Sequence, residues 1–272
     1  MKRRNSRCRP YLGYMHLLLI DSMVYKMNLL SSFMSSIIEF IVMIFIWTAV
    51  FHSRSSIAGF SFSEMITYLC IAQGITAIYG WSNAIEARVS ERIRDGSIAF
   101  DLLKPVRFNL ARIAEGIGSS FIQVIFVVLL LAVIHLFVPS FHGPSSWTHG
   151  IVFVISVCLG YTVMSFISLM AGLASFYLMS YWGIYYTKKA IVDLFSGSLV
   201  PLILLPTWLR TASDLLPFSQ IVYTPTMIWL GKINGAGLVL ALGKQIGWAV
   251  LLYFLSESIY ARAIRKVTIN GG

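Results

Sequence analysis

The stretch FIQVIFVVLLLAVIHLFV, residues 121–138, contains no Asp, Glu, Lys or Arg. A helix formed by an apolar run of this length crosses roughly 30 Å of hydrocarbon. Similar runs recur along the 272 residues, of which 57% are hydrophobic and only 12% charged. A soluble domain carries about 25% charged residues. The sequence therefore predicts an all-α integral membrane protein and argues against one or two soluble domains.

The apolar pattern predicts six transmembrane helices in a single domain spanning 1–272. The expected spans are roughly 28–50, 64–81, 115–138, 150–178, 188–208 and 237–260. Residues 11–27 are apolar but short, and Asp21 and Lys26 interrupt them, which favours an amphipathic helix lying along the inner membrane surface. Residues 1–27 thus form a tail and an interfacial helix, and 261–272 form a second tail. The basic start, MKRRNSRCRP, is followed by no small-residue cleavage site, so we expect it to be retained.

Basic residues set the expected orientation. With the N-terminus inside, the inner segments hold all of the 21 Lys and Arg residues except Arg54, Arg210, Lys232 and Lys244. This asymmetry follows the positive-inside rule and predicts that both termini are cytoplasmic. The net charge of +10 does not indicate nucleic-acid binding, because the basic residues lie between apolar spans rather than on one face or tail.

Residues 195–235 form an irregular region. Ser196-Gly197-Ser198 is followed by Pro201, Pro206, Pro217 and Pro225, and proline breaks the helical hydrogen-bond ladder. Backbone groups freed in lipid must be covered by protein or water. The pattern predicts a kinked fifth span and then short outer helices that re-enter the membrane. The alternative is an ordinary surface loop.

The stretch EARVSERIRDGSIAFDLLKPVRF, residues 86–108, is the most highly charged segment between the spans. Asn83 is a suitable cap for an amphipathic helix that ends at Asp95-Gly96. Ile85, Val89 and Ile93 recur every four residues on one face. The rest of the helix surface is expected to be covered by Glu86, Arg88, Glu91, Arg92 and Arg94. One interpretation is a solvated cytoplasmic loop held at the membrane; the other is a docking surface for a soluble partner.

Two motifs carry a resemblance to a known family. The run ERIRDGSIAFDLLKPVRF, residues 91–108, resembles the segment after the second span in type-2 ABC transporter permeases. The positions that match that pattern are Ile93, Arg94, Gly96, Ile98, Leu102, Leu103, Pro105 and Val106. LPFSQIVYTPTMIWLG, residues 216–231, is similar to that family's outer re-entrant region. The resemblance covers essentially the whole chain and is closest to stand-alone permeases with no fused ATPase.

The resemblance implies a mechanism and partners. Such permeases pair with the same or a homologous permease, and two ATP-binding subunits act on them from the cytoplasm, each gripping a coupling helix. Residues 83–95 would be the coupling helix and 11–27 the connecting helix. The expected ATPase-coupling residues are Arg88, Glu91, Arg92, Ile93, Arg94, Asp95 and Gly96. Because the sequence contains no GxxxxGK[ST] phosphate loop, ATP and Mg are expected in the partner, with no cofactor in this chain.

Polar residues within the spans are candidates for a substrate path. The set is Glu39, Gln73, Thr76, Tyr79, Ser196 and Ser198. A carboxylate in the membrane is costly and usually faces the interior or a wet cavity, so Glu39 is either a contact for a cationic substrate or part of an interhelical hydrogen bond. Asp193 lies one turn from Lys188 and Lys189, and a local ion pair is expected there. Small residues on the fourth span, Ser165, Ser168, Gly172 and Ser175, predict close helix packing.

Nothing in the sequence indicates a catalytic site. The five histidines form no HExxH pair, and the three cysteines form no CxxC pair, so neither a metal site nor a disulfide framework is expected. The favoured hypothesis is the permease subunit of an ABC exporter in the inner membrane, which moves an amphipathic or hydrophobic molecule such as a drug, lipid or natural product. The alternatives are a secondary transporter driven by an ion gradient and a non-transporting membrane assembly factor.

Overall fold

A computed structural model describes residues 9–24, 26–80, 83–104, 106–178 and 180–266. The description does not include the motif residue Pro105 or the terminal tails 1–8 and 267–272. The predicted cap also lies outside it, because the side chain of Asn83 is not described. The α-helices are α1 (Arg9–Val24), α2 (Lys26–Phe51), α3 (Phe62–Gly80), α4 (Asn83–Arg94), α5 (Ile98–Leu102), α6 (Phe108–Phe137), α7 (Trp147–Leu173), α8 (Tyr181–Phe195), α9 (Thr207–Leu215), α10 (Tyr223–Trp229) and α11 (Ala236–Ala263). Short 3-10 helices are η1 (Ala174–Phe176), η2 (Leu202–Leu204), η3 (Pro217–Gln220) and η4 (Ile264–Lys266).

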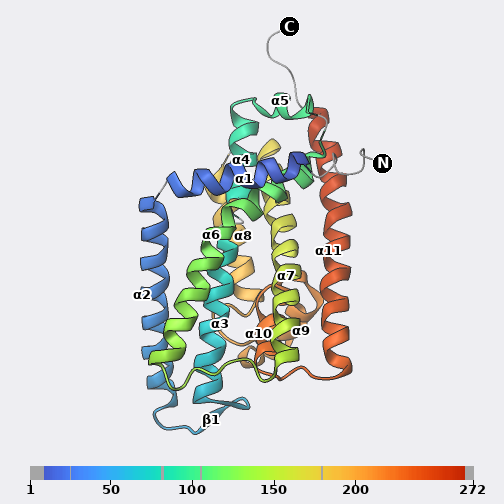
Figure 1. The fold of residues 1–272 in the computed structure, drawn as a ribbon. Coiled ribbons are helices and arrows are strands. Elements are labelled where there is room, and N and C mark those ends of the chain that lie inside the picture. Colours follow the sequence, from blue (N-terminus) through green and yellow to red (C-terminus); the bar gives the residue numbers. More distant parts are fainter. Residues whose placement is uncertain (1–8, 25, 81–82, 105, 179, 267–272) are drawn as a thin grey trace, which may run out of the picture.

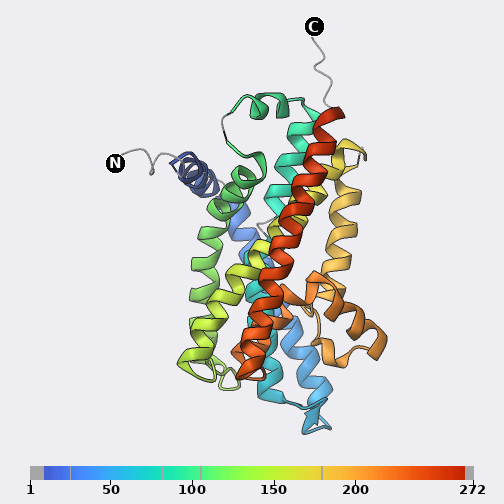
Figure 2. The same ribbon diagram turned by 90° about the vertical axis from the view of Figure 1, so that its right-hand side faces the viewer.

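The long helices run side by side along one axis (Figures 1 and 2). At one end, called here the α4 end, lie α1, α4, α5 and the last turn of α11. At the other, the hairpin end, strands β1 (Ser56–Ile57) and β2 (Phe60–Ser61) pair antiparallel. Among the described residues, four helices contain a segment long and apolar enough to cross a membrane: Met34–Phe51, Phe108–Phe137, Trp147–Phe176 and Ala236–Ala263.

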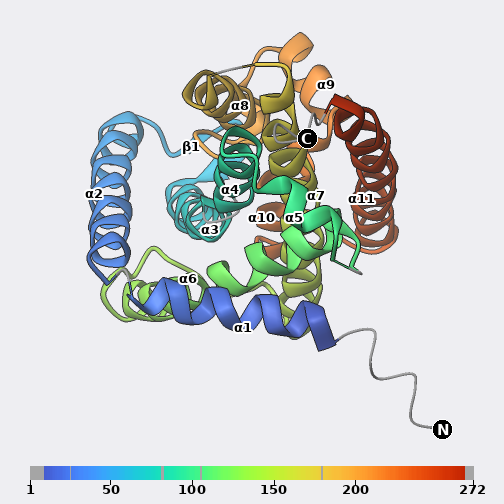
Figure 3. The ribbon, with the colours of Figure 1, turned by 90° about the horizontal axis from the view of Figure 1, so that it is seen from above.

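Helix α3 occupies the centre of the bundle (Figure 3). It is buried along nearly its whole length, from Met65 and Tyr68 to Ile75 and Tyr79. Because protein rather than lipid surrounds it, α3 tolerates Thr, Gln and Tyr positions that lower its hydropathy. Helix α2, in contrast, lies at the periphery and leaves apolar side chains such as Ile38 and Phe45 exposed.

Helix α1 lies across the bundle axis against α6 (Figures 1 and 3). The close approach depends on Gly118, where an added Cβ would sit 2.3 Å from the carbonyl oxygen of Met15. The position agrees with the expected connecting helix. The expected amphipathic pattern is wrong, because apolar residues are spread around α1 and Leu12 and Leu17 remain exposed.

The predicted fifth span, 188–208, is wrong in its bounds. Helix α8 starts at Tyr181, where the Ser180 hydroxyl accepts a hydrogen bond from the Gly183 amide, and ends at Phe195. It ends there because Gly197 has a φ of +80°, a left-handed conformation that breaks the helix. The chain then continues through short pieces rather than through a kink.

Those short pieces, η2, α9, η3 and α10, pack in the hairpin-end half of the bundle (Figure 1). The hydroxyl of Tyr68 on α3 donates to the carbonyl of Gly197 at 2.6 Å. The amide of Gln245 on α11 donates to the carbonyls of Gln220 at 2.8 Å and Ser156 at 3.1 Å. The carbonyls of Gly197 and Gln220 are therefore bonded to protein groups, as the folded-back interpretation requires of backbone away from water.

Candidate functional site

Helix α4 is seated on α7 at the α4 end of the bundle. Ile85 and Val89 are fully buried, which confirms the predicted apolar face, although that face contacts protein rather than the membrane surface. A Cβ on Gly172 would sit 2.9 Å from the Cβ of Val89, and the hydroxyls of Ser90 and Ser175 lie 2.7 Å apart. The small residues at this end of α7 thus permit close helix packing, as predicted, and the helix that packs against them is α4.

Glu86 joins α4 to α8. Its carboxylate accepts a short hydrogen bond from the Lys188 ammonium, which also donates to the Ser168 hydroxyl at 3.3 Å. The expectation that Glu86 covers the solvent face of the helix is therefore wrong, since the residue is wholly buried. Burial raises the pKa of Glu86, an effect that the neighbouring ammonium only partly opposes. Asp193 pairs with Lys189 at 2.7 Å, which confirms the predicted local ion pair.

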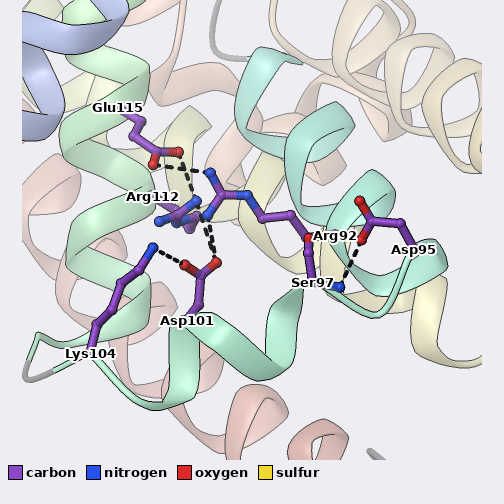
Figure 4. Close-up of polar contacts among 7 residues, drawn as sticks. All are labelled: Arg92, Asp95, Ser97, Asp101, Lys104, Arg112 and Glu115. Atoms are coloured by element: carbon purple, nitrogen blue, oxygen red, sulfur yellow. Dashed lines mark hydrogen bonds and ion pairs between the residues drawn. The ribbon is translucent and has the colours of Figure 1, made fainter. Parts of the chain in front are cut away.

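Asp101 is the centre of a second cluster, which joins α4, α5 and α6 (Figure 4). Its carboxylate contacts Arg92 at 2.5 Å and Lys104 at 2.7 Å. Glu115 on α6 contacts Arg112 at 2.9 Å and Arg92 at 3.4 Å. The hydrogen bond to Asp101 raises the pKa of Lys104, although partial burial opposes the effect. The cluster fixes the short helix α5 to the ends of two longer helices.

The turn between α4 and α5 is built by Asp95, Gly96 and Ser97. Gly96 has a φ of +76°, which an L side chain adopts only with strain. The Asp95 carboxylate accepts a hydrogen bond from the Ser97 amide at 2.8 Å, and this contact lowers the pKa of Asp95. The predicted end of the helix at Asp95-Gly96 is confirmed.

The outer side of this turn is exposed. We define the docking surface as Glu91, Arg94, Asp95, Gly96, Phe100 and Leu103. Phe100 and Leu103 are large apolar side chains with exposed fractions of 69% and 82%. Of the other expected coupling residues, Arg88, Arg92 and Ile93 are half-buried. The structure thus divides the predicted set into residues that face outward and residues that hold the helix in place.

The expected path residues lie in two places. Thr76, Tyr79, Ser196 and Ser198 line one cavity of about 140 Å³ between α3, α8 and the segment after η3. We call it the polar cavity; its full lining is Thr76, Tyr79, Gly80, Met164, Tyr185, Lys188, Lys189, Val192, Asp193, Ser196, Ser198, Ile221 and Val222. The structure therefore brings together two pairs of residues that are about 120 positions apart in the sequence, and the second pair comes from a span whose bounds were mispredicted.

Glu39 and Gln73 lie apart from that cavity. The Gln73 amide donates a short hydrogen bond to the Glu39 carboxylate, linking α2 to α3. This confirms the interhelical hydrogen bond as an interpretation of Glu39, and a role in binding stays a prediction. Glu257 accepts a hydrogen bond from the Asn109 amide at 3.0 Å, which links α11 to α6.

The ion-pair residues Asp101, Arg112 and Glu115 and the pairing of Glu86 with Lys188 were not anticipated as a site. The spacing of Arg112 and Glu115, three residues apart on one helix, is a local signal that predicts a pair. The pair between Glu86 and Lys188 joins positions 102 residues apart, and no local pattern indicates it. Within the described ranges, no group of three or more His, Cys, Asp or Glu side chains is placed to hold a metal ion.

The long apolar helices define a multi-pass helical membrane protein. Its family follows from a comparison with known families: residues 37–271 match the ABC-2 family transporter protein model. The chain therefore belongs to the ABC-2 family, whose members are the membrane components of ABC transporters, and it is a permease of that class. No curated protein matches the sequence.

Proposed function

We propose that this chain is the permease subunit of an ATP-driven ABC exporter, with ATP and Mg bound and hydrolysed in a separate subunit. The observation that carries the proposal is the docking surface, where Phe100 and Leu103 stand exposed beside charged residues of the α4–α5 turn. Apolar side chains at the end of a membrane bundle, rimmed by polar residues, are typical of a protein contact. The absence of a phosphate loop from the sequence is in keeping with a partner that supplies ATP.

Three contacts would carry a movement of the docking surface into the long helices. Gly172 lets α4 pack directly on α7, Glu86 links α4 to α8, and Arg92 links it to Glu115 on α6. A partner that shifts α4 would therefore shift α6, α7 and α8 with it, because a close-packed interior has low compressibility and transmits displacement. This arrangement supports α4 as the coupling helix.

The proposed topology has six spans, formed by α2, α3, α6, α7, α8 and α11. Helix α3 would cross within the bundle, covered by protein, and α8 with η2 and the following short helices would form the fifth passage. The α4 end is assigned to the cytoplasm because the basic residues of the charged stretch lie there. Both termini would then be cytoplasmic, in the inner membrane.

The proposed assembly has two permeases, identical or homologous, and two ATP-binding subunits. Its cargo would be an amphipathic or hydrophobic molecule such as a drug, lipid or natural product. The polar cavity supports a role for Thr76, Tyr79, Ser196 and Ser198 in the path, since their side chains line a common space.

The test is capture of the ATPase through the docking surface. The full chain carries a single added cysteine at Leu103, and the native cysteines are replaced by serine. We expect a cross-link to an ATP-binding subunit in native membranes, and stimulation of that subunit's ATPase on reconstitution. Arg94→Glu, on the exposed face, should reduce the stimulation at least tenfold, and Lys244→Glu, on exposed α11, should not. Transport that persists without ATP and collapses with an uncoupler would contradict the proposal.

A further inference from the structure

A large apolar hollow lies between α6 and α7, and we call it the α6–α7 groove. Its volume is about 450 Å³. Its walls include Val124 and Val128 on α6 and Val154 and Val157 on α7. Its floor is formed by α3, which lies behind α6 in Figure 1 and contributes Ile75. The groove is separate from the polar cavity, with which it shares no lining residue.

The lining of the groove suits an apolar ligand. Among the described residues, no Asp, Glu, Lys or Arg lines it. Its hydroxyl groups are already bonded within the protein. The Ser120 and Tyr161 hydroxyls lie 3.0 Å apart, and the Thr162 hydroxyl donates to the carbonyl of Cys158 at 2.9 Å. The groove therefore offers a ligand van der Waals contact rather than hydrogen bonds or charge.

The size of the groove fits a single hydrocarbon chain. An apolar cavity of about 150 Å³ accepts benzene, with its six carbons, so about 450 Å³ has room for roughly 18 carbons. Along α6 the lining runs from Ile117 to Leu131, which is about 21 Å at the rise of an α-helix. The hydrocarbon of one leaflet is about 15 Å thick. A helix of the same length, with its side chains, occupies about 2,000 Å³ and would not fit inside.

The groove opens toward the lipid that surrounds the bundle. Both of its walls belong to helices that are long and apolar enough to cross a membrane, Phe108–Phe137 and Trp147–Phe176. At its rim, Phe121, Val128 and Val154 have exposed fractions of 54%, 60% and 58%. A void beside these side chains would forfeit dispersion contacts. In the bilayer, the material available to fill it is an acyl chain.

One end of the groove lies where α1 crosses α6. Ile117, at the end of the lining, precedes Gly118, the glycine that admits the backbone of Met15. The exposed cations Lys104 and Arg107 lie at the same α4 end of the bundle. Basic residues at a membrane surface attract anionic lipid head groups. A phospholipid with its phosphate at the level of α1 can therefore extend an acyl chain along the groove.

We propose that the α6–α7 groove binds one acyl chain of a bilayer phospholipid from the leaflet at the α4 end, and that this lipid stays bound while those around the bundle exchange. The bound acyl chain packs between two helices that both contact α4, through Glu115 on α6 and Gly172 on α7. It therefore helps to set the separation of the helices on which α4 is seated. The inference requires neither the ATPase nor a direction of transport.

The first test asks what stays bound to the protein. The full protein is extracted from its membranes into a mild detergent, and native mass spectrometry records the bound molecules. We expect one phospholipid to be retained by each copy of the protein. Recovery of the bare protein, or of a retained molecule that is not a phospholipid, would overturn the proposal.

Matched variants place the retained lipid in the groove. Val128→Trp and Val154→Trp each add an indole to a wall of the groove and should lower the retained fraction at least about tenfold, because the indole takes the space of the acyl chain. Val133→Trp and Ile151→Trp are the controls. They lie on the same two helices, are 50% and 62% exposed, and are outside the lining, so they should retain the lipid. Equal retention in all four variants would place the lipid elsewhere and refute the groove as its site.

The second test separates the groove from ordinary lipid contact. The protein is reconstituted in phosphatidylcholine nanodiscs with a trace of phosphatidylcholine that carries a diazirine in the middle of one acyl chain. After illumination, we expect adducts to concentrate on residues 117–131 and 153–162. Ile38 and Phe45 on α2 provide the comparison, since they are 59% and 72% exposed and lie outside the lining. Equal labelling of the two surfaces would mean contact with exchanging lipid only. Disulfide cross-linking of Val128→Cys between two copies would assign the groove to a second permease instead; either result contradicts the proposal.

Discussion

Replacement of Asp101 by Asn is expected to release α5 from the rest of the protein. The Asp101 side chain is 5% exposed and contacts Arg92 at 2.5 Å, Lys104 at 2.7 Å and Arg112 at 3.7 Å. The amide of Asn has nearly the same shape as the carboxylate but no charge. After the change, Arg92 and Arg112 keep their contacts with Glu115, whereas the ion pair of Lys104 with Asp101 is lost.

The magnitude follows from the burial of the partners. Breaking a fully buried pair by removing one member costs about 3–5 kcal/mol. The Arg92 and Lys104 side chains are 26% and 44% exposed, so water compensates part of the loss. We therefore expect the free energy of opening α5 to fall by about 2–3 kcal/mol, with little change in the long helices.

Hydrogen exchange of the full chain in nanodiscs measures this opening directly. A loss of that size should speed exchange of the α5 amides by about 30- to 150-fold. Asp95→Asn is the matched control, because Asp95 is exposed and bonds the Ser97 amide, and its effect should stay below about threefold. Unchanged exchange in Asp101→Asn, or an equal effect in Asp95→Asn, would refute the role assigned to the cluster.

Three further predictions test other parts of the structure. Gly96→Ala should destabilise the turn by about 1–2 kcal/mol because an L side chain is strained at a φ of +76°. A steric clash does not contribute, since nothing lies within 4 Å of an added Cβ. Gly96→Asn should cost less, and equal hydrogen exchange in the two variants would count against backbone strain as the cause. Phe100→Asp/Leu103→Asp should reduce recovery of the ATPase at least tenfold while the thermal midpoint of the permease shifts little, since both side chains are exposed; a large shift would mean that they pack internally. In a background without native cysteines, an impermeant maleimide should label Leu103→Cys from the cytoplasm and Gly143→Cys from outside; the reverse pattern would invert the topology.

The sequence predicted the positions of most long helices because lipid-facing runs are apolar throughout. The expected span 237–260 corresponds to α11, Ala236–Ala263, and 28–50 corresponds to α2, Lys26–Phe51. The fifth span failed for a physical reason. The prediction started the span at Lys188, whereas α8 already starts at Tyr181, and the apolar residues after Gly197 do not continue the helix.

The candidate site was partly predictable. The four-residue repeat of Ile85 and Val89 indicated the buried face of α4, and the small residues around Gly172 indicated a close helix contact. Glu86 was misplaced because helical periodicity assigns a charged residue to solvent, whereas a distant lysine can compensate its burial. Such ion pairs depend on tertiary structure, and neither local sequence segment contains a pattern that predicts them.

The shortness of α8 has a consequence for the surrounding bilayer. Its 15 residues span about 22 Å, well below the roughly 30 Å of an average hydrocarbon core. The leaflet beside the C-terminal end of α8 therefore meets the compact segment of η2 and α9 instead of a continuous helix. Hydrophobic mismatch beside α8 should make the protein more stable in bilayers with shorter acyl chains. Lipid chain length should therefore affect the activity of the protein.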